Sequence, residues 1–167
     1  NVLRVPSGEG SSVEFIFIGP KTIGEEELVN EGIAHKMILA GKMRRYFSLK
    51  NFTDVFKMPL GFLQSLWHLF VFMPNVIFSK GGYGSVPVVL AAWIFRIPVL
   101  IHESDAIPGL ANKFCAKFSK RIAISYMDSA QYFPEKKTAL TGNPVRAGLY
   151  GGLKEEALRL FGLSGAK

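Results

Sequence analysis

The stretch SKGGYGSVP at residues 79–87 directly follows the apolar run VIF at residues 76–78. A strand that ends in paired glycines and continues as a helix leaves backbone N–H groups around the turn, close to the positive end of the helix macrodipole. Gly81 and Gly82 have no Cβ, so the backbone there can approach an anionic group closely. Ser85 is placed to cap the helix, and Pro87 suits its first turn. The turn is either a purely structural connection or an anion-binding site.

Apolar runs and helix-like segments alternate on both sides of this turn. Strands are predicted at residues 13–18, 34–39, 76–78, 97–101, 121–125 and 138–140, and helices at 25–30, 49–72, 86–95, 108–118 and 127–132. A break in the longest helix is expected at Pro59-Leu60-Gly61, because proline removes a backbone donor. Apolar strands that alternate with helices predict an α/β fold, a Rossmann-like parallel sheet with helices on both faces. Ligands of such sheets bind beyond the carboxyl ends of the strands.

A cluster of ionisable residues follows the predicted strand at 97–101. If this strand neighbours the one at 76–78, the cluster lies beside the glycine turn. His102 is interpreted as a packed or hydrogen-bonded residue rather than a base. Glu103 suits hydrogen bonds to sugar hydroxyls or to nearby backbone. Asp105 is either a turn or cap residue of the following helix or a ligand contact.

The segment TGNPVR at residues 141–146 follows the last predicted strand. Its Asn-Pro pair favours a turn, because the residue before proline is kept out of the helical region. The turn holds Arg146 near the mouth of the sheet, where a guanidinium suits phosphate or carboxylate. An isolated arginine after a turn is also typical of a solvated side chain, so the segment alone leaves both interpretations open.

A basic cluster that includes Arg44 and Arg45 precedes an aromatic helix. Such a pairing suits an anionic bilayer surface. The alternative is that the apolar face of the helix packs on the sheet. The spacing predicts a core-facing stripe and two residues at its edges that are better candidates for exposure; the stripe is Leu63, Leu66, Trp67 and Phe70, and the edge residues are Phe62 and Phe72.

The composition of the 167 residues limits the class of protein. It has 49% hydrophobic residues and 14 phenylalanines, but no apolar run approaches the roughly 18–20 residues that span a bilayer. The net charge of +7 and the pI near 9.6 predict an anionic partner. Nucleic acid is disfavoured, because no recognition-helix, zinc-ligand or RNA-binding pattern is present. No metal-ligand, paired-carboxylate or nucleophile-elbow motif occurs, and no signal peptide is recognisable.

Cys115 is the single cysteine, which excludes an internal disulfide. It lies on an apolar stripe of the helix predicted at residues 108–118. This placement favours a buried structural thiol over a catalytic one.

Together with GKMRRY at residues 41–46, the three segments at 79–87, 101–113 and 141–146 resemble the acceptor-side domain of the MurG family. The resemblance runs from about residue 13 to residue 146. It implies a GT-B fold with two Rossmann-like domains and inverting transfer of N-acetylglucosamine from UDP-N-acetylglucosamine to lipid I, the undecaprenyl-pyrophosphoryl-muramyl-pentapeptide, forming lipid II for peptidoglycan. It also implies a peripheral location on the cytoplasmic face of the bacterial inner membrane, with no metal and no cofactor.

The resemblance implies roles for individual residues. Matching motifs place Gly81, Gly82 and Tyr83 at the acceptor pyrophosphate, Asp105 at the donor, Arg146 at the nucleotide sugar and Glu103 in the cleft. The family often has Asn where Asp105 stands, and an ionised Asp accepts hydrogen bonds but donates none. Membrane docking is expected of Arg44, Arg45, Phe62 and Trp67. The general base is not identified, and neither His102 nor Glu103 is assigned to it.

The chain also departs from the MurG pattern at both ends. Residues 1–12 contain no GGTGGH-like loop, and the 167 residues include no match to the family's donor domain. We expect residues 1–146 to form the acceptor domain without its first strand and glycine loop, residues 147–167 to begin the linker or donor domain, and the chain alone to lack transferase activity. The alternatives are a non-catalytic, lipid-pyrophosphate-binding docking subunit of a split glycosyltransferase and another GT-B member such as a nucleotide-sugar epimerase.

Overall fold

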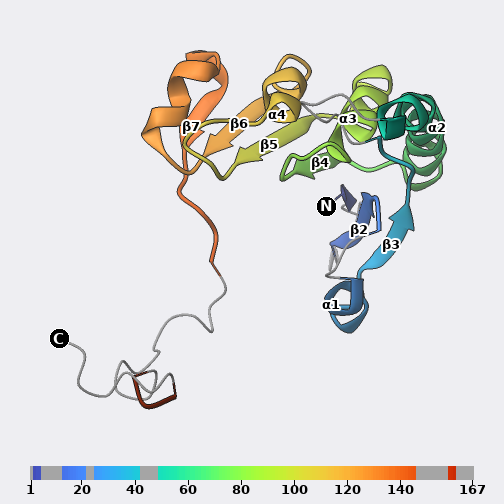
Figure 1. The fold of residues 1–167 in the computed structure, drawn as a ribbon, viewed down its shortest axis with the longest axis horizontal. Coiled ribbons are helices and arrows are strands. Elements are labelled where there is room, and N and C mark those ends of the chain that lie inside the picture. The colour runs from blue at the N-terminus through green and yellow to red at the C-terminus, as the bar shows by residue number, and fades with distance from the viewer. Residues whose placement is uncertain (1, 5–12, 22–24, 42–48, 146–157, 161–167) are drawn as a thin grey trace.

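A computed structural model describes residues 2–4, 13–21, 25–41, 49–145 and 158–160 of the chain. These residues form a sheet of seven strands in the order β3-β2-β1-β4-β5-β6-β7 (Figure 1). The strands are β1 (Val2–Arg4), β2 (Glu14–Gly19), β3 (Ala34–Met37), β4 (Val76–Ser79), β5 (Val99–Glu103), β6 (Arg121–Ile124) and β7 (Thr138–Leu140). The pairs β2–β3, β4–β5, β5–β6 and β6–β7 are parallel, as the alternating pattern predicts.

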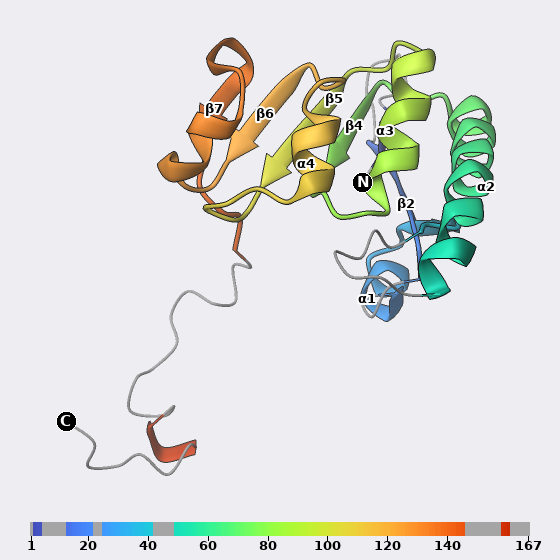
Figure 2. The same ribbon diagram turned by 45° about the horizontal axis from the view of Figure 1, so that its top comes forward.

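Helices connect these parallel strands. They are α1 (Glu25–Asn30), α2 (Leu49–Phe72), α3 (Ser85–Ile94) and α4 (Leu110–Cys115), with 3₁₀ turns η1 (Met127–Tyr132) and η2 (Glu135–Lys137) before β7. Figures 1 and 2 show α2, α3 and α4 side by side on one face of the sheet, whereas α1 lies on the other side, beside β3. The predicted Rossmann-like α/β fold is confirmed, with most of the described helical cover on one face.

Strand β1, the third in the sheet order, is the exception to the parallel arrangement. It pairs antiparallel with both neighbours, and Val2 stands opposite Ile16 of β2 and Ile77 of β4. Residues 5–13 separate β1 from β2, and a parallel crossover takes a dozen or more residues. The sequence predicted no strand at residues 2–4, and the short connection to β2 accounts for its antiparallel direction.

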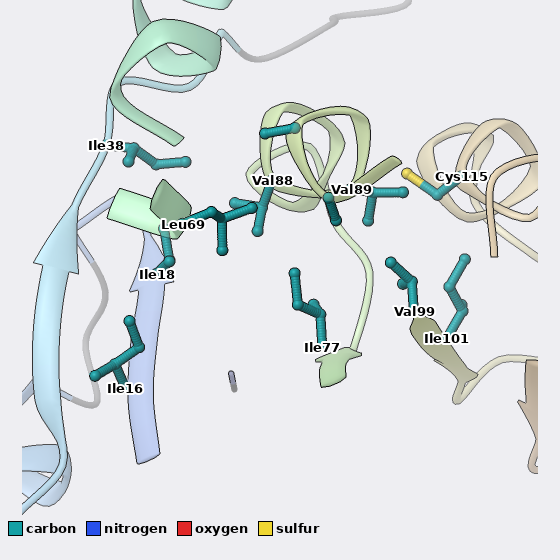
Figure 3. Close-up of a cluster of buried hydrophobic side chains, with 12 residues drawn as sticks. Ile16, Ile18, Ile38, Leu69, Ile77, Val88, Val89, Val99, Ile101 and Cys115 are labelled. Atoms are coloured by element: carbon teal, nitrogen blue, oxygen red, sulfur yellow. The ribbon is translucent and has the colours of Figure 1, made fainter. Parts of the chain in front are cut away.

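The core lies between the sheet and the helices α2, α3 and α4 (Figure 3). The side chains that point into it from the strands are aliphatic and branched, which suits strands covered on that face. Small residues of α3 let the helix lie close to the sheet. The core residues are Ile16, Ile18, Ile38, Ile77, Val99 and Ile101 from the sheet side and Leu69, Val88, Val89, Ala91, Ala92 and Cys115 from the helices.

The predicted break in the long helix was wrong, because α2 continues through Pro59. Gly61 has a different role. A Cβ at this position would overlap with the backbone carbonyl of Leu39, so the glycine lets α2 lie against the chain that follows β3. Two hydrogen bonds support this approach: the Leu39 N–H donates to Gln64 Oε1 over 2.7 Å, and Ser65 Oγ donates to the Gly61 carbonyl over 2.7 Å.

The small residues Gly61 and Ser65 also determine which face of α2 is buried. Phe62, Leu66 and Phe72 pack against the core beside them. The apolar residues on the opposite face are exposed: Leu63 at 59%, Trp67 at 63% and Phe70 at 59%. Phe62 and Phe72 were predicted as the better candidates for exposure, and this was wrong. Of the four residues predicted to face the core, only Leu66 does so. Two apolar stripes have similar spacing, and close approach at the small residues selects between them.

Candidate functional site

The candidate site lies at the carboxyl ends of β4 and β5, where the glycine turn and the ionisable cluster meet. The two strands are parallel neighbours, with Ser79 opposite Ile101. The segments that follow them line a common cavity of about 640 Å³. The predicted juxtaposition of the two loops is confirmed. The cavity lining includes Lys80, Gly82 and Tyr83 from the turn and Glu103, Ser104, Asp105 and Asn112 from the second loop and α4.

The glycine turn is stabilised largely by its own groups. Gly81 and Gly82 have φ of +86° and +83°, a left-handed conformation that favours glycine. The Gly81 N–H donates to Ser79 Oγ over 3.2 Å, so this N–H is not free for a ligand. A Cβ at Gly81 would overlap with the amide of Asn112, whereas one at Gly82 would meet open space. The close approach that requires Gly81 is therefore to Asn112.

The predicted cap at Ser85 was wrong. The helix α3 begins at Ser85 itself, with Gly84 at the N-cap and no side-chain cap. The hydroxyl and the N–H of Ser85 both donate to the Gly82 carbonyl, over 2.7 and 3.2 Å. A serine side chain caps a helix from the N-cap position, and here Ser85 is the first helical residue while Gly84 stands at the N-cap. Pro87 does lie in the first turn, as predicted.

His102 links the three sequence segments. The ring is buried, with 3% of the residue exposed, because β5 extends two residues beyond the predicted strand. Nδ1 accepts a hydrogen bond from Lys80 Nζ over 3.0 Å, since an ammonium can only donate. Nε2 then carries the hydrogen and donates to the Gly142 carbonyl over 3.0 Å. His102 is thus a packed, hydrogen-bonded residue, as interpreted from the sequence, and it joins residues 79–87 to residues 141–146.

Lys80 is the residue of this site that sequence reasoning missed. Its side chain is exposed, and Nζ donates to Ser104 Oγ over 2.9 Å as well as to His102. The signal that could have found it is the strand register. Because Ser79, the last residue of β4, stands opposite Ile101, the residues that follow these two, Lys80 and His102, lie close together.

Glu103 is held by protein groups on both carboxylate oxygens. Oε1 accepts the Asp105 N–H over 2.9 Å, and Oε2 accepts Asn112 Nδ2 over 2.8 Å. Glu103 was predicted to bind either sugar hydroxyls or nearby backbone, and the structure shows the bond to nearby backbone. The oxygen of the same Asn112 amide, Oδ1, is buried without a hydrogen-bond partner among the described residues. Asp105 is exposed on the cavity and does not cap α4, which begins after Gly109 at the N-cap.

Three predicted site residues, Arg44, Arg45 and Arg146, lie outside the described residues. Just before Arg146, the Gly142 carbonyl also accepts hydrogen bonds from Ser125 Oγ and Thr141 Oγ1, over 3.4 and 3.3 Å. These hydrogen bonds join Gly142, near the start of the 141–146 segment, to residues at the carboxyl ends of β5 and β6.

Cys115 is fully buried, and burial raises the pKa of its thiol to about 11. A hydrogen bond with Ser85 has a smaller and opposite effect on this pKa. The prediction of a structural thiol is confirmed. Within the described ranges, no group of three or more His, Cys, Asp or Glu residues could hold a metal ion. No helix in the described part of the chain has both the length and the apolar character needed to cross a membrane.

Comparison with known proteins identifies the class. The glycosyltransferase family 28 N-terminal domain matches residues 7–124. The chain therefore belongs to glycosyltransferase family 28, and the resemblance seen in the sequence is confirmed. The structure is similar to that of Acinetobacter baumannii MurG, with a TM-score of 0.62 and 22% identity over 87% of this chain and 43% of that one. This likeness supports the fold.

Two curated relatives carry a more particular name. The chain is 39% identical over its whole length to the UDP-N-acetylglucosamine--N-acetylmuramyl-(pentapeptide) pyrophosphoryl-undecaprenol N-acetylglucosamine transferase 2 of Bacillus cereus. It is 40% identical, again over its whole length, to the corresponding transferase of Clostridium botulinum. The alignments cover 48% and 47% of these relatives, so the chain spans about half the length of the curated relatives it matches.

Proposed function

We propose that this chain is the acceptor-binding half of an inverting glycosyltransferase that transfers N-acetylglucosamine from UDP-N-acetylglucosamine to lipid I. The observation that carries the proposal is the joining of three sequence segments at one rim of the sheet by the chain Lys80–His102–Gly142. The names of the relatives support the choice of substrates. In this proposal residues 1–146 form the acceptor domain, and residues 147–167 begin the linker to a donor domain.

The substrate contacts that we propose follow the rim. Gly81, Gly82 and Tyr83 lie at the acceptor pyrophosphate, and the exposed Asp105 faces the donor across the larger cavity. Glu103 is held at the same cavity by Asn112 and the Asp105 N–H, which fixes its carboxylate beside the sugar. Arg146 follows the anchored Gly142 and reaches the nucleotide sugar.

The reaction needs a general base for the muramyl hydroxyl and positive groups that stabilise the leaving UDP. His102 does not suit the base, because both ring nitrogens are engaged, Nδ1 by Lys80 and Nε2 by the Gly142 carbonyl. The two carboxylate oxygens of Glu103 are engaged as well. The described rim therefore supplies binding and orientation, and we assign the base to none of its residues.

We further propose that the protein docks on the anionic cytoplasmic surface of the bacterial inner membrane. The outer face of α2 exposes Leu63, Trp67 and Phe70, and the Phe70 ring lies 6.5 Å from that of Phe95 after α3. An exposed apolar face beside basic residues suits the boundary of an anionic bilayer. Arg96 directly follows Phe95 and, with Lys120 and the exposed Trp93, lines a hollow. Arg44 and Arg45 of the basic cluster precede α2 in the sequence.

A transfer assay tests the proposal. The protein is expressed from its gene together with the adjoining reading frame, and transfer of labelled N-acetylglucosamine from UDP-N-acetylglucosamine to lipid I is measured. Product lipid II supports the proposal, and the 167-residue chain alone is expected to form none. Lipid I binding without transfer by the longer protein would instead favour the docking-subunit alternative. Absence of both binding and transfer contradicts the proposal.

A further inference from the structure

The cavity of about 640 Å³ at the rim has an apolar part that none of the substrate contacts above uses. Among the described residues that line it, the charged ones are Lys80, Glu103 and Asp105, whereas four other side chains are large and apolar. These four form the apolar wall: Met58 from α2, Val86 from α3, and Leu110 and Phe114 from α4. Valine, leucine and phenylalanine side chains have no hydrogen-bonding group, and methionine has only a weakly accepting sulfur. This part of the cavity therefore suits a hydrocarbon group.

The apolar wall is attached to the core and is also exposed to solvent. Leu110 and Phe114 lie four residues apart, which places them on one face of α4. Leu110 is 59% exposed and Phe114 is 40% exposed. The Phe114 ring lies 5.3 Å from the ring of Phe118, and both Phe118 and Val86 pack against the core. The wall is therefore preformed, and a ligand that covers it removes apolar surface from water.

The apolar wall also leads toward the helix face proposed to meet the bilayer. Met58 belongs to α2, and the exposed Leu63 follows it by five residues, about 7.5 Å along the helix axis. A hydrocarbon chain that starts at the polar rim and passes Met58 can therefore continue to the membrane surface. This continuity favours a lipid whose polar group lies at the rim and whose chain begins in the cavity.

We propose that the apolar wall binds the first isoprene units of a prenyl-diphosphate acceptor. The identification of the chain as that of the acceptor rests on the proposed function. A sugar or a peptide group at this wall would leave its polar groups without partners, a cost that hydrocarbon does not incur. Pockets of about 300–1,000 Å³ hold small ligands, so the cavity has room for a few isoprene units and not for a long polyprenyl chain. The affinity therefore rises with chain length only until the chain extends beyond the wall.

Calorimetry with a series of prenyl diphosphates tests this wall on the 167-residue chain. Dimethylallyl, geranyl and farnesyl diphosphate carry the same charged group and differ in the length of the chain. We expect geranyl diphosphate to bind about tenfold or more tightly than dimethylallyl diphosphate, since each buried CH₂ group strengthens binding about fourfold. This ratio of affinities is the chain-length gain. The further gain with farnesyl diphosphate is expected to be smaller.

Substitutions show whether the apolar wall produces this gain. Leu110→Gln replaces an exposed side chain of the wall and is expected to reduce the chain-length gain about threefold or more, whereas Leu110→Met retains most of it. Met58→Gln, on a different helix, reduces the gain as well. The matched control is Val29→Gln, which changes an exposed apolar residue of α1 on the other side of the sheet and leaves the gain unchanged. Unchanged thermal unfolding shows that each variant is folded.

Dihexanoyl phosphatidylglycerol distinguishes the chain of a substrate from the acyl chain of a membrane lipid. Its binding is expected to be the same in the wild type and in Leu110→Gln. The proposal is overturned if affinity does not rise from dimethylallyl to geranyl diphosphate, or if Leu110→Gln and Met58→Gln keep the full chain-length gain. It is also overturned if Val29→Gln loses as much of the gain, or if Leu110→Gln weakens binding of phosphatidylglycerol as much as binding of geranyl diphosphate.

This proposal and the proposed function can fail separately. A chain-length gain that depends on Leu110, in a protein that transfers no N-acetylglucosamine, would refute the proposed function and leave the apolar wall standing as a prenyl site. Transfer to lipid I by a protein whose chain shows no such gain would sustain the proposed function and overturn the role of the wall.

Discussion

At the scale of single residues, Gly81 and Gly82 have nearly the same left-handed backbone but different surroundings. A side chain in this conformation costs about 1–2 kcal/mol, which is the expected loss for Gly82→Ala. Gly81→Ala is expected to lose about 1–3 kcal/mol more, because its Cβ overlaps with the Asn112 amide. Urea unfolding of both variants measures the difference.

The control for this prediction is a double-mutant cycle with Asn112→Ala. Removing the amide opens the space that the Gly81→Ala methyl needs, so the additional loss is expected to disappear in that background. Gly82→Ala is expected to cost the same with and without Asn112. Equal losses for the two glycine variants in the wild-type background would show that Asn112 is not the obstacle.

The buried thiol of Cys115 predicts a dependence of stability on pH. Its pKa is about 11 in the folded chain against 9.0 for an unperturbed thiol. Below pH 9 both states are protonated, and stabilisation is complete. Between pH 9 and pH 11 only the unfolded chain ionises, so stability falls by about 2–3 kcal/mol. Because Cys115→Ala lacks this thiol, the difference in unfolding free energy between the wild type and this variant should narrow by that amount from pH 8 to pH 11. A constant difference would contradict the prediction.

The segments that form the site were predictable from the sequence, but the contacts within the site were not. The glycine turn and the cluster at residues 102–105 each follow an apolar strand, and parallel strands bring such ends to one edge. A lysine such as Lys80 is ordinarily a solvated residue, and its pairing with His102 depends on the register between β4 and β5. Likewise, Glu103 is directed to Asn112 by α4, nine residues further along. Such contacts depend on tertiary geometry, which local patterns do not contain.

At the scale of elements, α2 approaches the chain after β3 closely at Gly61, and this approach predicts that a glycine-to-alanine change within a helix lowers stability instead of raising it. Alanine in place of glycine within a helix ordinarily stabilises by about 1 kcal/mol. Gly61→Ala is expected to destabilise by about 2 kcal/mol instead, because its methyl overlaps with the Leu39 carbonyl. Chemical denaturation measures the change. The control is Leu60→Ala on the exposed side of α2, for which a change within about 0.5 kcal/mol is expected. A stabilised Gly61→Ala variant would contradict the close approach.

The same helix shows where element prediction succeeded and failed. Alternation of apolar runs with helical segments predicted the described strands from β2 to β7 and the helices between them. Burial against a sheet requires apolar residues at the spacing typical of each kind of element. The face of α2 was not predictable, because two apolar stripes compete and Gly61 and Ser65 select between them. The direction of β1 was not predicted either, since no apolar run marks residues 2–4 as a strand.

At the scale of the whole molecule, the exposed face of α2 predicts how the protein meets a membrane. We expect the chain to float with phosphatidylglycerol vesicles and to bind phosphatidylcholine vesicles more weakly, because its net charge is +7. Leu63→Glu is expected to lower binding about tenfold or more, since it removes apolar burial and adds a repelled charge. The matched control is Val29→Glu on α1, which makes the same charge change at an exposed apolar residue on the other side of the sheet. Flotation that is equally weakened by both variants would show that net charge, and not the face of α2, governs docking.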